Sequence, residues 1–238
     1  MQAIICVKGE IHNILTGLRL THPSYSSNEH QLYAYSYENN NVVAHSLKHL
    51  NEKLSNVAHF FELDACDLVK PFLTVITAAE SQSTYRVKLM ALRSIQKILL
   101  YGFITADQSI NAHIAIQQTA EAIIACDFSD INGITTDEVA ISWMRVLELI
   151  LELIQCTSGY ILYNDTIIKL FHKCFQIRSL SKVSDLLRKY SESIILQIVL
   201  VIFSRLNPET KTGGTSFIST STDNNNQNDI KSSTKPYN

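Results

Sequence analysis

Apolar residues recur every three or four positions through most of the first 206 residues. This spacing is typical of amphipathic helices, because positions i, i+3, i+4 and i+7 share one side of a helix. No stretch shows the strict alternation of apolar and polar residues that indicates a strand. The pattern predicts seven or eight helices, one of them short, over about residues 3–20, 42–61, 71–79, 85–103, 109–126, 136–155, 164–177 and 183–206.

Local signals place several of the helix ends. Pro71 suits the first turn of a helix, where its missing N–H leaves no hydrogen bond unmade, so we expect a short helix to begin there. Thr135, with Glu138 three residues later, has the form of a capping box that opens a long helix. Asn164 or Asp165 is expected to cap the helix that follows.

The last predicted helix is apolar on nearly all sides, with Leu196, Leu200 and Phe203 among its residues. Such a helix is either central or covered by something else. Because it ends the folded part of the chain, we expect these three residues to pack against neighbouring helices or a following domain. A core helix in an irregular bundle is the other interpretation.

Two segments lack the helical pattern. Residues 21–41 are rich in Ser, Asn and Tyr and are interpreted as a surface insertion. Residues 207–238 contain almost no apolar residues and are expected to form a disordered linker or tail. The sequence therefore predicts one helical domain over 1–206. We expect an all-α, armadillo-like α-solenoid, with an irregular bundle as the alternative because no repeat period is visible.

Composition narrows the classes of partner and compartment. Net charge is −2, which provides no general attraction for nucleic acid. The first residues do not resemble a secretory signal, and the longest apolar run is too short to cross a bilayer, so a cytoplasmic location is expected. The five cysteines match neither a disulfide framework nor a zinc pattern, and we interpret them as reduced and mostly buried.

The chain carries none of the short motifs that mark common catalytic sites. His45 and His49 have the i, i+4 spacing of two metal ligands, but no third ligand is apparent, and exposed histidines are the simpler interpretation. Cys66 lies beside Asp64 and Asp67, which would raise its thiol pKa, so it is interpreted as structural. We expect no enzyme activity, no metal and no cofactor.

Two helices combine charge with apolar residues on one side. In the helix at 85–103, a basic stripe of Arg86, Arg93 and Lys97 is flanked by Leu89 and Met90. In the helix at 136–155, the opposite sign appears, with acidic and apolar residues interleaved: Glu138, Glu148, Glu152, Leu149 and Leu153. Surfaces of opposite sign on one chain can pair across a two-fold axis. Two solvated helix faces are the alternative.

Six strings occur in order along the chain: VKPFLTVI (69–76), SIQKILLYGFI (94–104), TTDEVAI (135–141), FHKCFQIR (171–178), VSDLLRKYSE (183–192) and VLVIFSRL (199–206). In their order and spacing they resemble the amino-terminal dimerisation and cyclophilin-binding (DCB) domain of the large Arf guanine-nucleotide exchange factors, in the Golgi GBF/Gea/GNOM branch. The resemblance covers most of the predicted helical region. The insertion at 21–41 departs from it.

The resemblance implies a non-catalytic dimerisation and regulatory module of a Golgi Arf exchange factor. It implies an armadillo-type stack, a homodimer surface that includes Lys97 and Glu138, and a following helical regulatory domain. Arf, Arl or Rab GTPases and a cyclophilin are implied as partners, with peripheral association with Golgi membranes in vesicle transport. The exchange domain is absent from this chain, so exchange activity is not implied. A self-contained α-solenoid adaptor that binds a peptide or helix is the alternative.

Overall fold

The computed structural model describes residues 2–20, 42–78, 82–128, 135–180 and 184–206. Helices make up nearly all of these residues, as the sequence predicts, and no strand occurs within them. The predicted insertion at 21–41 and the predicted tail at 207–238 lie outside the described residues. The α-helices of the described part are α1 (Gln2–Leu20), α3 (Val42–Asn56), α4 (Ala65–Thr77), α5 (Gln82–Leu100), α6 (Ala112–Ala125), α7 (Thr136–Gln155), α8 (Asn164–Arg178) and α9 (Asp185–Leu206), with 3₁₀ turns η2 (Phe60–Glu62) and η3 (Gly159–Ile161).

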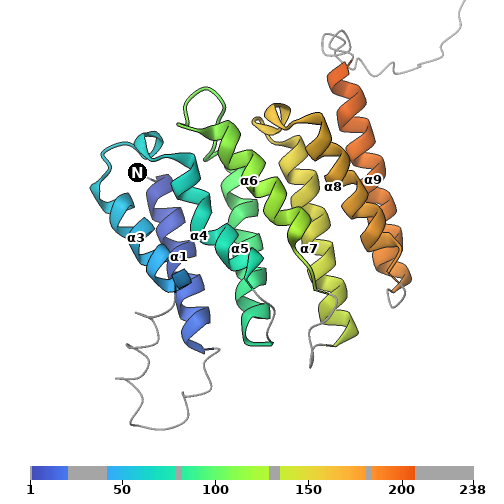
Figure 1. Ribbon diagram of the computed structural model, residues 1–238, viewed down its shortest axis with the longest axis horizontal. Coiled ribbons are helices and arrows are strands. Elements are labelled where there is room, and N and C mark those ends of the chain that lie inside the picture. Colours follow the sequence, from blue (N-terminus) through green and yellow to red (C-terminus); the bar gives the residue numbers. More distant parts are fainter. Residues whose placement is uncertain (1, 21–41, 79–81, 129–134, 181–183, 207–238) are drawn as a thin grey trace, which may run out of the picture.

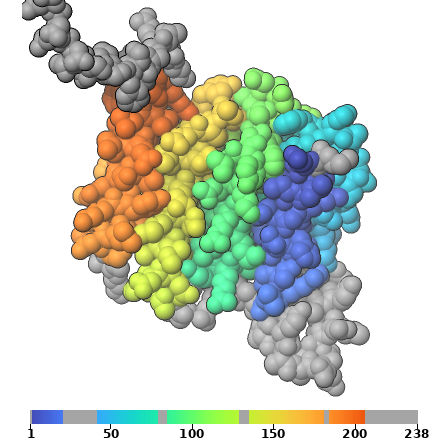
Figure 2. Space-filling view, turned by 180° about the vertical axis from the view of Figure 1, so that it is seen from behind, coloured from blue at the N-terminus to red at the C-terminus, as the bar shows by residue number. Residues whose placement is uncertain are grey.

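The helices form two layers (Figure 1). In one layer α1 packs on α5, α5 on α7 and α7 on α9, and these four helices lie side by side in Figure 2. In the other layer α3 packs on α4, α4 on α6 and α6 on α8. Successive hairpins α4–α5, α6–α7 and α8–α9 therefore stack along one direction. The prediction of an all-α fold is confirmed, and the stacking is that of an α-solenoid.

Side-chain hydrogen bonds show which way the helices run. The hydroxyl of Tyr85, near the start of α5, donates to the carbonyl of Glu138 in the first turn of α7 at 2.8 Å. The Arg205 guanidinium, at the end of α9, donates to the carbonyl of Ile154 at the end of α7. Helices α5, α7 and α9 are thus parallel.

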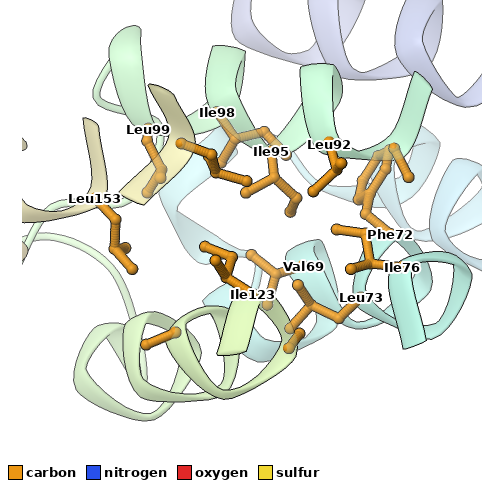
Figure 3. Close-up of a cluster of buried hydrophobic side chains, with 14 of the residues drawn as sticks. Val69, Phe72, Leu73, Ile76, Leu92, Ile95, Ile98, Leu99, Ile123 and Leu153 are labelled. Carbon is orange, nitrogen blue, oxygen red and sulfur yellow. The ribbon is translucent and has the colours of Figure 1, made fainter. Parts of the chain in front are cut away.

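The main core lies between the two layers (Figure 3). Phe72, Ile95 and Ile123 come from α4, α5 and α6 and have no more than 1% of their surface exposed. Within each of these helices the buried residues recur at the helical period, as the sequence predicts. Burial of these faces, at about 25 cal/mol per Å² of apolar surface, is the main stabilising contribution.

One expected helix start and one expected helix cap are wrong. Helix α4 begins at Ala65, because the Asp64 carboxylate caps it by accepting from the Cys66 N–H at 2.8 Å, so Pro71 lies inside the helix. The proline ring is buried, and this burial offsets part of the penalty for a proline in a helix. Helix α8 has Tyr163 as its N-cap residue, without a side-chain cap, and Asp165 forms an ion pair with Lys169 at 2.5 Å instead.

The other predicted ends differ from the structure by a few residues. The largest difference is at α3, which ends at Asn56 rather than near residue 61. Phe60 and Phe61 belong to the separate turn η2, and Phe60 is buried against Phe103 with ring centroids 5.3 Å apart. The capping box of Thr135 and Glu138 at the start of α7 is confirmed.

Candidate protein interaction surfaces

The outer side of α5 carries the predicted basic stripe. Ala91, Leu92, Ile95 and Ile98 turn towards the core and are at most 1% exposed, which leaves the opposite side of the helix to solvent. Arg86 and Arg93 are exposed there, whereas Leu89, Met90 and Lys97 are half-buried. Basic and apolar groups therefore share this side of the helix, as the sequence predicts.

Lys97 already has a partner within the chain. Its Nζ lies 2.5 Å from Oε1 of Glu10 on α1, and the Ser94 hydroxyl donates to Oε2 of Glu10 at 2.8 Å. The Glu10 side chain is 12% exposed and that of Lys97 is 44% exposed. A mostly buried carboxylate thus depends on Lys97. The sequence analysis missed this contact, because the pairing of α1 with α5 is not visible in the pattern of either helix.

Glu138 is also engaged within the chain. Its carboxylate accepts from the Thr135 N–H at 3.0 Å and from the Thr135 hydroxyl at 3.0 Å. These two hydrogen bonds, with a smaller contribution from the charge of Arg86, lower the pKa of the Glu138 carboxyl. Glu138 therefore stays ionised at neutral pH and stabilises the start of α7.

Lys97 and Glu138 lie towards opposite ends of two parallel helices. Tyr85 is level with the first turn of α7, and Lys97 follows it by about 18 Å along α5, at 1.5 Å per residue. The two charged groups of one protomer are therefore too far apart to pair with each other.

The acidic stripe of α7 differs from its prediction in the apolar residues. Leu149 and Leu153 are 1% and 0% exposed and belong to the core, so neither can flank a surface stripe. The exposed apolar residue of this side is Ile141, which is 49% exposed and which the sequence analysis did not select. Glu152 is half-buried, and burial raises its carboxyl pKa.

Glu148, the third acidic residue of that stripe, is neutralised within the chain. Its carboxylate accepts from Arg145 at 2.6 Å and from the Tyr190 hydroxyl of α9 at 3.2 Å. Glu148 therefore helps to hold α9 against α7. We refer to the exposed or half-buried residues of the outer side of α5 and α7 as the α5–α7 surface: Arg86, Leu89, Met90, Arg93, Lys97, Glu138, Ile141 and Glu152.

Helix α9 lies at the edge of the stack (Figure 1). Leu196, Leu200 and Phe203 are 59%, 60% and 64% exposed, so they do not pack against neighbouring helices as one form of the prediction required. The buried side of α9 is formed by Leu187, Ile194 and Ile198 instead. The three exposed residues, at i, i+4 and i+7, make an apolar row that no other described helix covers.

The residues considered for chemistry do not assemble into a site in the described part of the chain. His45 and His49 are exposed on α3, and no described His, Cys, Asp or Glu residues gather in a group of three that could hold a metal ion. The pKa of the Cys66 thiol is raised to about 11, first by burial and then by Asp64. Among the described helices, none is long and apolar enough to cross a membrane.

The relatives found by comparison with known proteins include two guanine nucleotide exchange factors. Over 169 aligned residues, the chain is 28% identical to the Golgi-specific brefeldin A-resistance guanine nucleotide exchange factor 1 homolog of Caenorhabditis elegans. The aligned region covers 71% of this chain and 8% of the relative. It is 29% identical over 210 residues to ARF guanine-nucleotide exchange factor 1 of Saccharomyces cerevisiae, covering 87% of this chain and 14% of the relative. The chain thus spans a small part of the length of both.

A family model also matches the chain. It describes the Mon2/Sec7/BIG1-like dimerisation and cyclophilin-binding domain, and it matches residues 25–210. This range includes α3 to α9 and therefore both surfaces described above. Because the match extends over well more than half of the sequence, the chain belongs to the DCB domain family of the large Arf guanine-nucleotide exchange factors.

Proposed function

We propose that this chain is a non-catalytic dimerisation and regulatory module of a Golgi Arf guanine-nucleotide exchange factor. The observation that carries the proposal is the α5–α7 surface, where exposed apolar and charged residues lie together in a domain of a family named for dimerisation. Both relatives are named as guanine-nucleotide exchange factors, and the chain spans 8% and 14% of their lengths.

The positions of Lys97 and Glu138 suit a symmetric homodimer. A two-fold axis that lies in the interface and runs across the helices, midway between the two residues, brings Lys97 of each protomer close to Glu138 of its partner. Both contacts then form at once. Because each group keeps a partner within its own protomer, the charges set register more than affinity. Leu89, Met90 and Ile141 supply the apolar contact.

Solution mass as a function of concentration tests the homodimer. We expect Ile141→Glu to weaken association, because it places a charge in the apolar part of the interface. Ile114→Glu is the matched control, since Ile114 is 39% exposed on α6 in the other layer. Glu138→Gln removes the charge but retains an acceptor for the capping box, so it tests the charge without opening the start of α7.

Light scattering and sedimentation on these variants decide the matter. A wild-type chain that stays monomeric at about 100 μM, roughly a hundred times a micromolar dissociation constant, contradicts the homodimer. Undiminished dimer in Ile141→Glu contradicts the α5–α7 surface as the site of contact.

We further propose that Leu196, Leu200 and Phe203 pack against a following helical regulatory domain in the intact protein. The apolar row at the edge of the stack supports this proposal. Through its parent protein the module is assigned to the cytoplasmic side of Golgi membranes in vesicle transport. Small GTPases of the Arf, Arl or Rab type and a cyclophilin are its proposed partners. The family name supports the cyclophilin, and the name of the yeast relative supports Arf.

The same apolar row favours a second candidate function, a self-contained adaptor that binds a helix or peptide of another protein. The two functions differ in self-association. If the chain is monomeric at all concentrations and a partner helix binds in a manner that depends on Leu200, the adaptor is supported and the dimerisation module is rejected.

A further inference from the structure

Three connections between helices lie at one end of the helices, the upper end in Figure 1. They join α3 to α4 through η2, α5 to α6 through residues 101–111, and α7 to α8 through η3. The Ala65 N–H donates to the Ile110 carbonyl at 3.0 Å, and the Ser158 hydroxyl donates to the Ile104 carbonyl at 2.9 Å. The three connections are therefore bonded to one another in a row along the stack.

This row exposes aromatic and apolar side chains, each between 37% and 64% exposed: Phe61, Tyr101, Ile110, Tyr160 and Tyr163. Among the tyrosines that the structure describes, the exposed ones are the three in this row. Tyrosine offers a large contact area at a low cost in conformational entropy, and it is enriched at the energetic centres of protein interfaces. We refer to these five residues as the loop surface.

Buried aromatic packing holds part of the loop surface in place. The ring of Phe60, which is 8% exposed, has its centroid 5.7 Å from that of Phe61 and 5.3 Å from that of Phe103. The Phe103 ring in turn lies 5.7 Å from that of Tyr101. An unbroken series of ring contacts thus joins Phe61 to Tyr101 across two connections. A surface that is already ordered loses little conformational entropy when a partner binds.

The charge of the three connections has one sign. Residues 57–64, 100–111 and 156–163 contain no Lys or Arg and three acidic residues, Glu62, Asp64 and Asp107. The first two accept hydrogen bonds from backbone N–H groups at the starts of their turns. Asp107 is exposed, and no hydrogen bond or ion pair joins its carboxylate to another residue that the structure describes. The loop surface is therefore aromatic and acidic.

This combination selects among possible occupants. An anionic membrane or a nucleic acid would be repelled by the carboxylates, and the connections supply no basic residue to attract either one. A second copy of the same surface would bring like charges together. An arginine guanidinium, by contrast, stacks on aromatic rings and pairs with carboxylates. A partner with arginine beside apolar residues is the complement of this surface.

We propose that the loop surface binds a basic amphipathic helix of another protein. The apolar stripe of that helix covers Phe61 and Ile110, and its arginine side chains stack on the exposed tyrosines and pair with Asp107. Neighbouring helices pack about 8–10 Å apart, so three successive connections span about 20 Å, the length of a helix of about 14 residues. The loop surface shares no residue with the α5–α7 surface or the exposed row of α9, so this interaction does not depend on self-association.

Peptide binding to the whole 238-residue chain tests the proposal. The probes are three fluorescein-labelled amphipathic peptides with the same leucine stripe, flanked by Arg, by Lys or by Glu. Fluorescence anisotropy should show that the Arg peptide binds at least about tenfold more tightly than the Glu peptide. The Lys peptide should bind with intermediate affinity, because an ammonium group pairs with carboxylates but lacks the planar stacking face. Added salt should weaken the preference, since the carboxylate contact is exposed.

Substitutions separate the aromatic contacts from the charge. Tyr101→Ala and Tyr163→Ala should each weaken binding of the Arg peptide about fivefold or more, whereas Tyr163→Phe keeps the ring and should bind as wild type. Asp107→Asn should reduce the preference for the Arg peptide over the Glu peptide. Ile114→Ala on α6 and Asp137→Asn on α7, at exposed positions outside the loop surface, are the matched controls and should bind as wild type. Circular dichroism checks that each variant is folded.

Several results would overturn the proposal. It is rejected if the Arg peptide fails to bind at about 100 μM, or binds no more tightly than the Glu peptide. Wild-type binding by both Tyr101→Ala and Tyr163→Ala places the peptide elsewhere, and a loss in Leu200→Asp alone then places it on the exposed row of α9. Binding to phosphatidylcholine vesicles that depends on Tyr163, without binding of the Arg peptide, identifies a neutral membrane surface instead. Equal affinity for the Arg and Lys peptides rejects stacking on the tyrosines.

Discussion

Removing the ammonium group of Lys97 should destabilise the monomer, even though Lys97 lies on the α5–α7 surface. The Glu10 side chain is 12% exposed, and without Lys97 its carboxylate keeps the hydrogen bond from the Ser94 hydroxyl but loses its ion pair. Breaking a fully buried ion pair costs about 3–5 kcal/mol, and an exposed one contributes about 0–1 kcal/mol. Because Lys97 is 44% exposed, we expect Lys97→Met to lower the free energy of unfolding by about 1–3 kcal/mol.

A double-mutant cycle separates this contact from other effects of the substitutions. Glu10→Gln keeps an acceptor for Ser94 and removes the charge that needs Lys97, so Lys97→Met should cost much less in the Glu10→Gln background. Urea unfolding followed by circular dichroism gives the four free energies. Lys169→Met, which breaks the exposed pair with Asp165, is the matched control and should leave the urea midpoint unchanged.

Two outcomes of the double-mutant cycle would contradict a stabilising Glu10–Lys97 ion pair. If Lys97→Met is as stable as wild type, or if the two substitutions add within about 0.3 kcal/mol, the ion pair contributes nothing and Lys97 is free to serve a partner alone. If the coupling is found, a loss of dimer in a Lys97 variant cannot be assigned to the interface without a stability measurement. This is why Ile141 and Glu138 are the better positions for testing self-association.

Three further outcomes follow from local geometry. Gly159→Ala should destabilise the fold, because a Cβ there would lie 2.5 and 2.6 Å from two carbonyl oxygens of α7. Gly9 lies at an exposed helical position with open space around its Cα, so Gly9→Ala should instead stabilise the fold by about 0.5–1 kcal/mol. Urea unfolding measures both effects. Thr135→Ala should lower the unfolding free energy by about 0.5–2 kcal/mol through loss of the cap, and helicity should fall if the first turn frays. Cys66 and Cys174, with thiol pKa values raised to about 11 and about 12, should react with iodoacetamide at pH 8 far more slowly than in urea; equal rates would contradict their burial.

The sequence was sufficient for the helices and for most of the core. Apolar positions at helical spacing mark the buried sides of α5 and α6, such as Ile95 and Ile123, because burial and periodicity have the same physical cause. The capping box at Thr135 was equally clear, since all its contacts are local. Pro71 was misleading because the signal that starts α4, the Asp64 cap, lies outside the apolar run.

The surfaces could be predicted only in part, because exposure depends on which helices become neighbours. Leu149 and Leu153 of α7 are buried by neighbouring helices. The sequence of α7 alone does not show which of its sides those neighbours cover. The Glu10–Lys97 pair joins residues 87 positions apart and has the same origin. On α9, by contrast, the nearly uniform apolar character was informative. One side of the helix is buried against the stack, and the apolar residues of the opposite side stay exposed.

The two proposed surfaces can be occupied at the same time, since they lie on different sides of the molecule. The α5–α7 surface is on the broad face of the layer formed by α1, α5, α7 and α9, which Figure 2 shows, whereas the exposed apolar row belongs to α9 at the edge of the stack. A two-fold axis that runs across the helices therefore leaves the open end of each protomer uncovered and directs both towards the same side of the dimer. Substitutions at Leu200 should then leave self-association unchanged, and substitutions at Ile141 should leave the exposed apolar row of α9 intact. Coupling between the two effects would mean that the surfaces share a helix movement, for which α7 is the candidate because it packs on both α5 and α9.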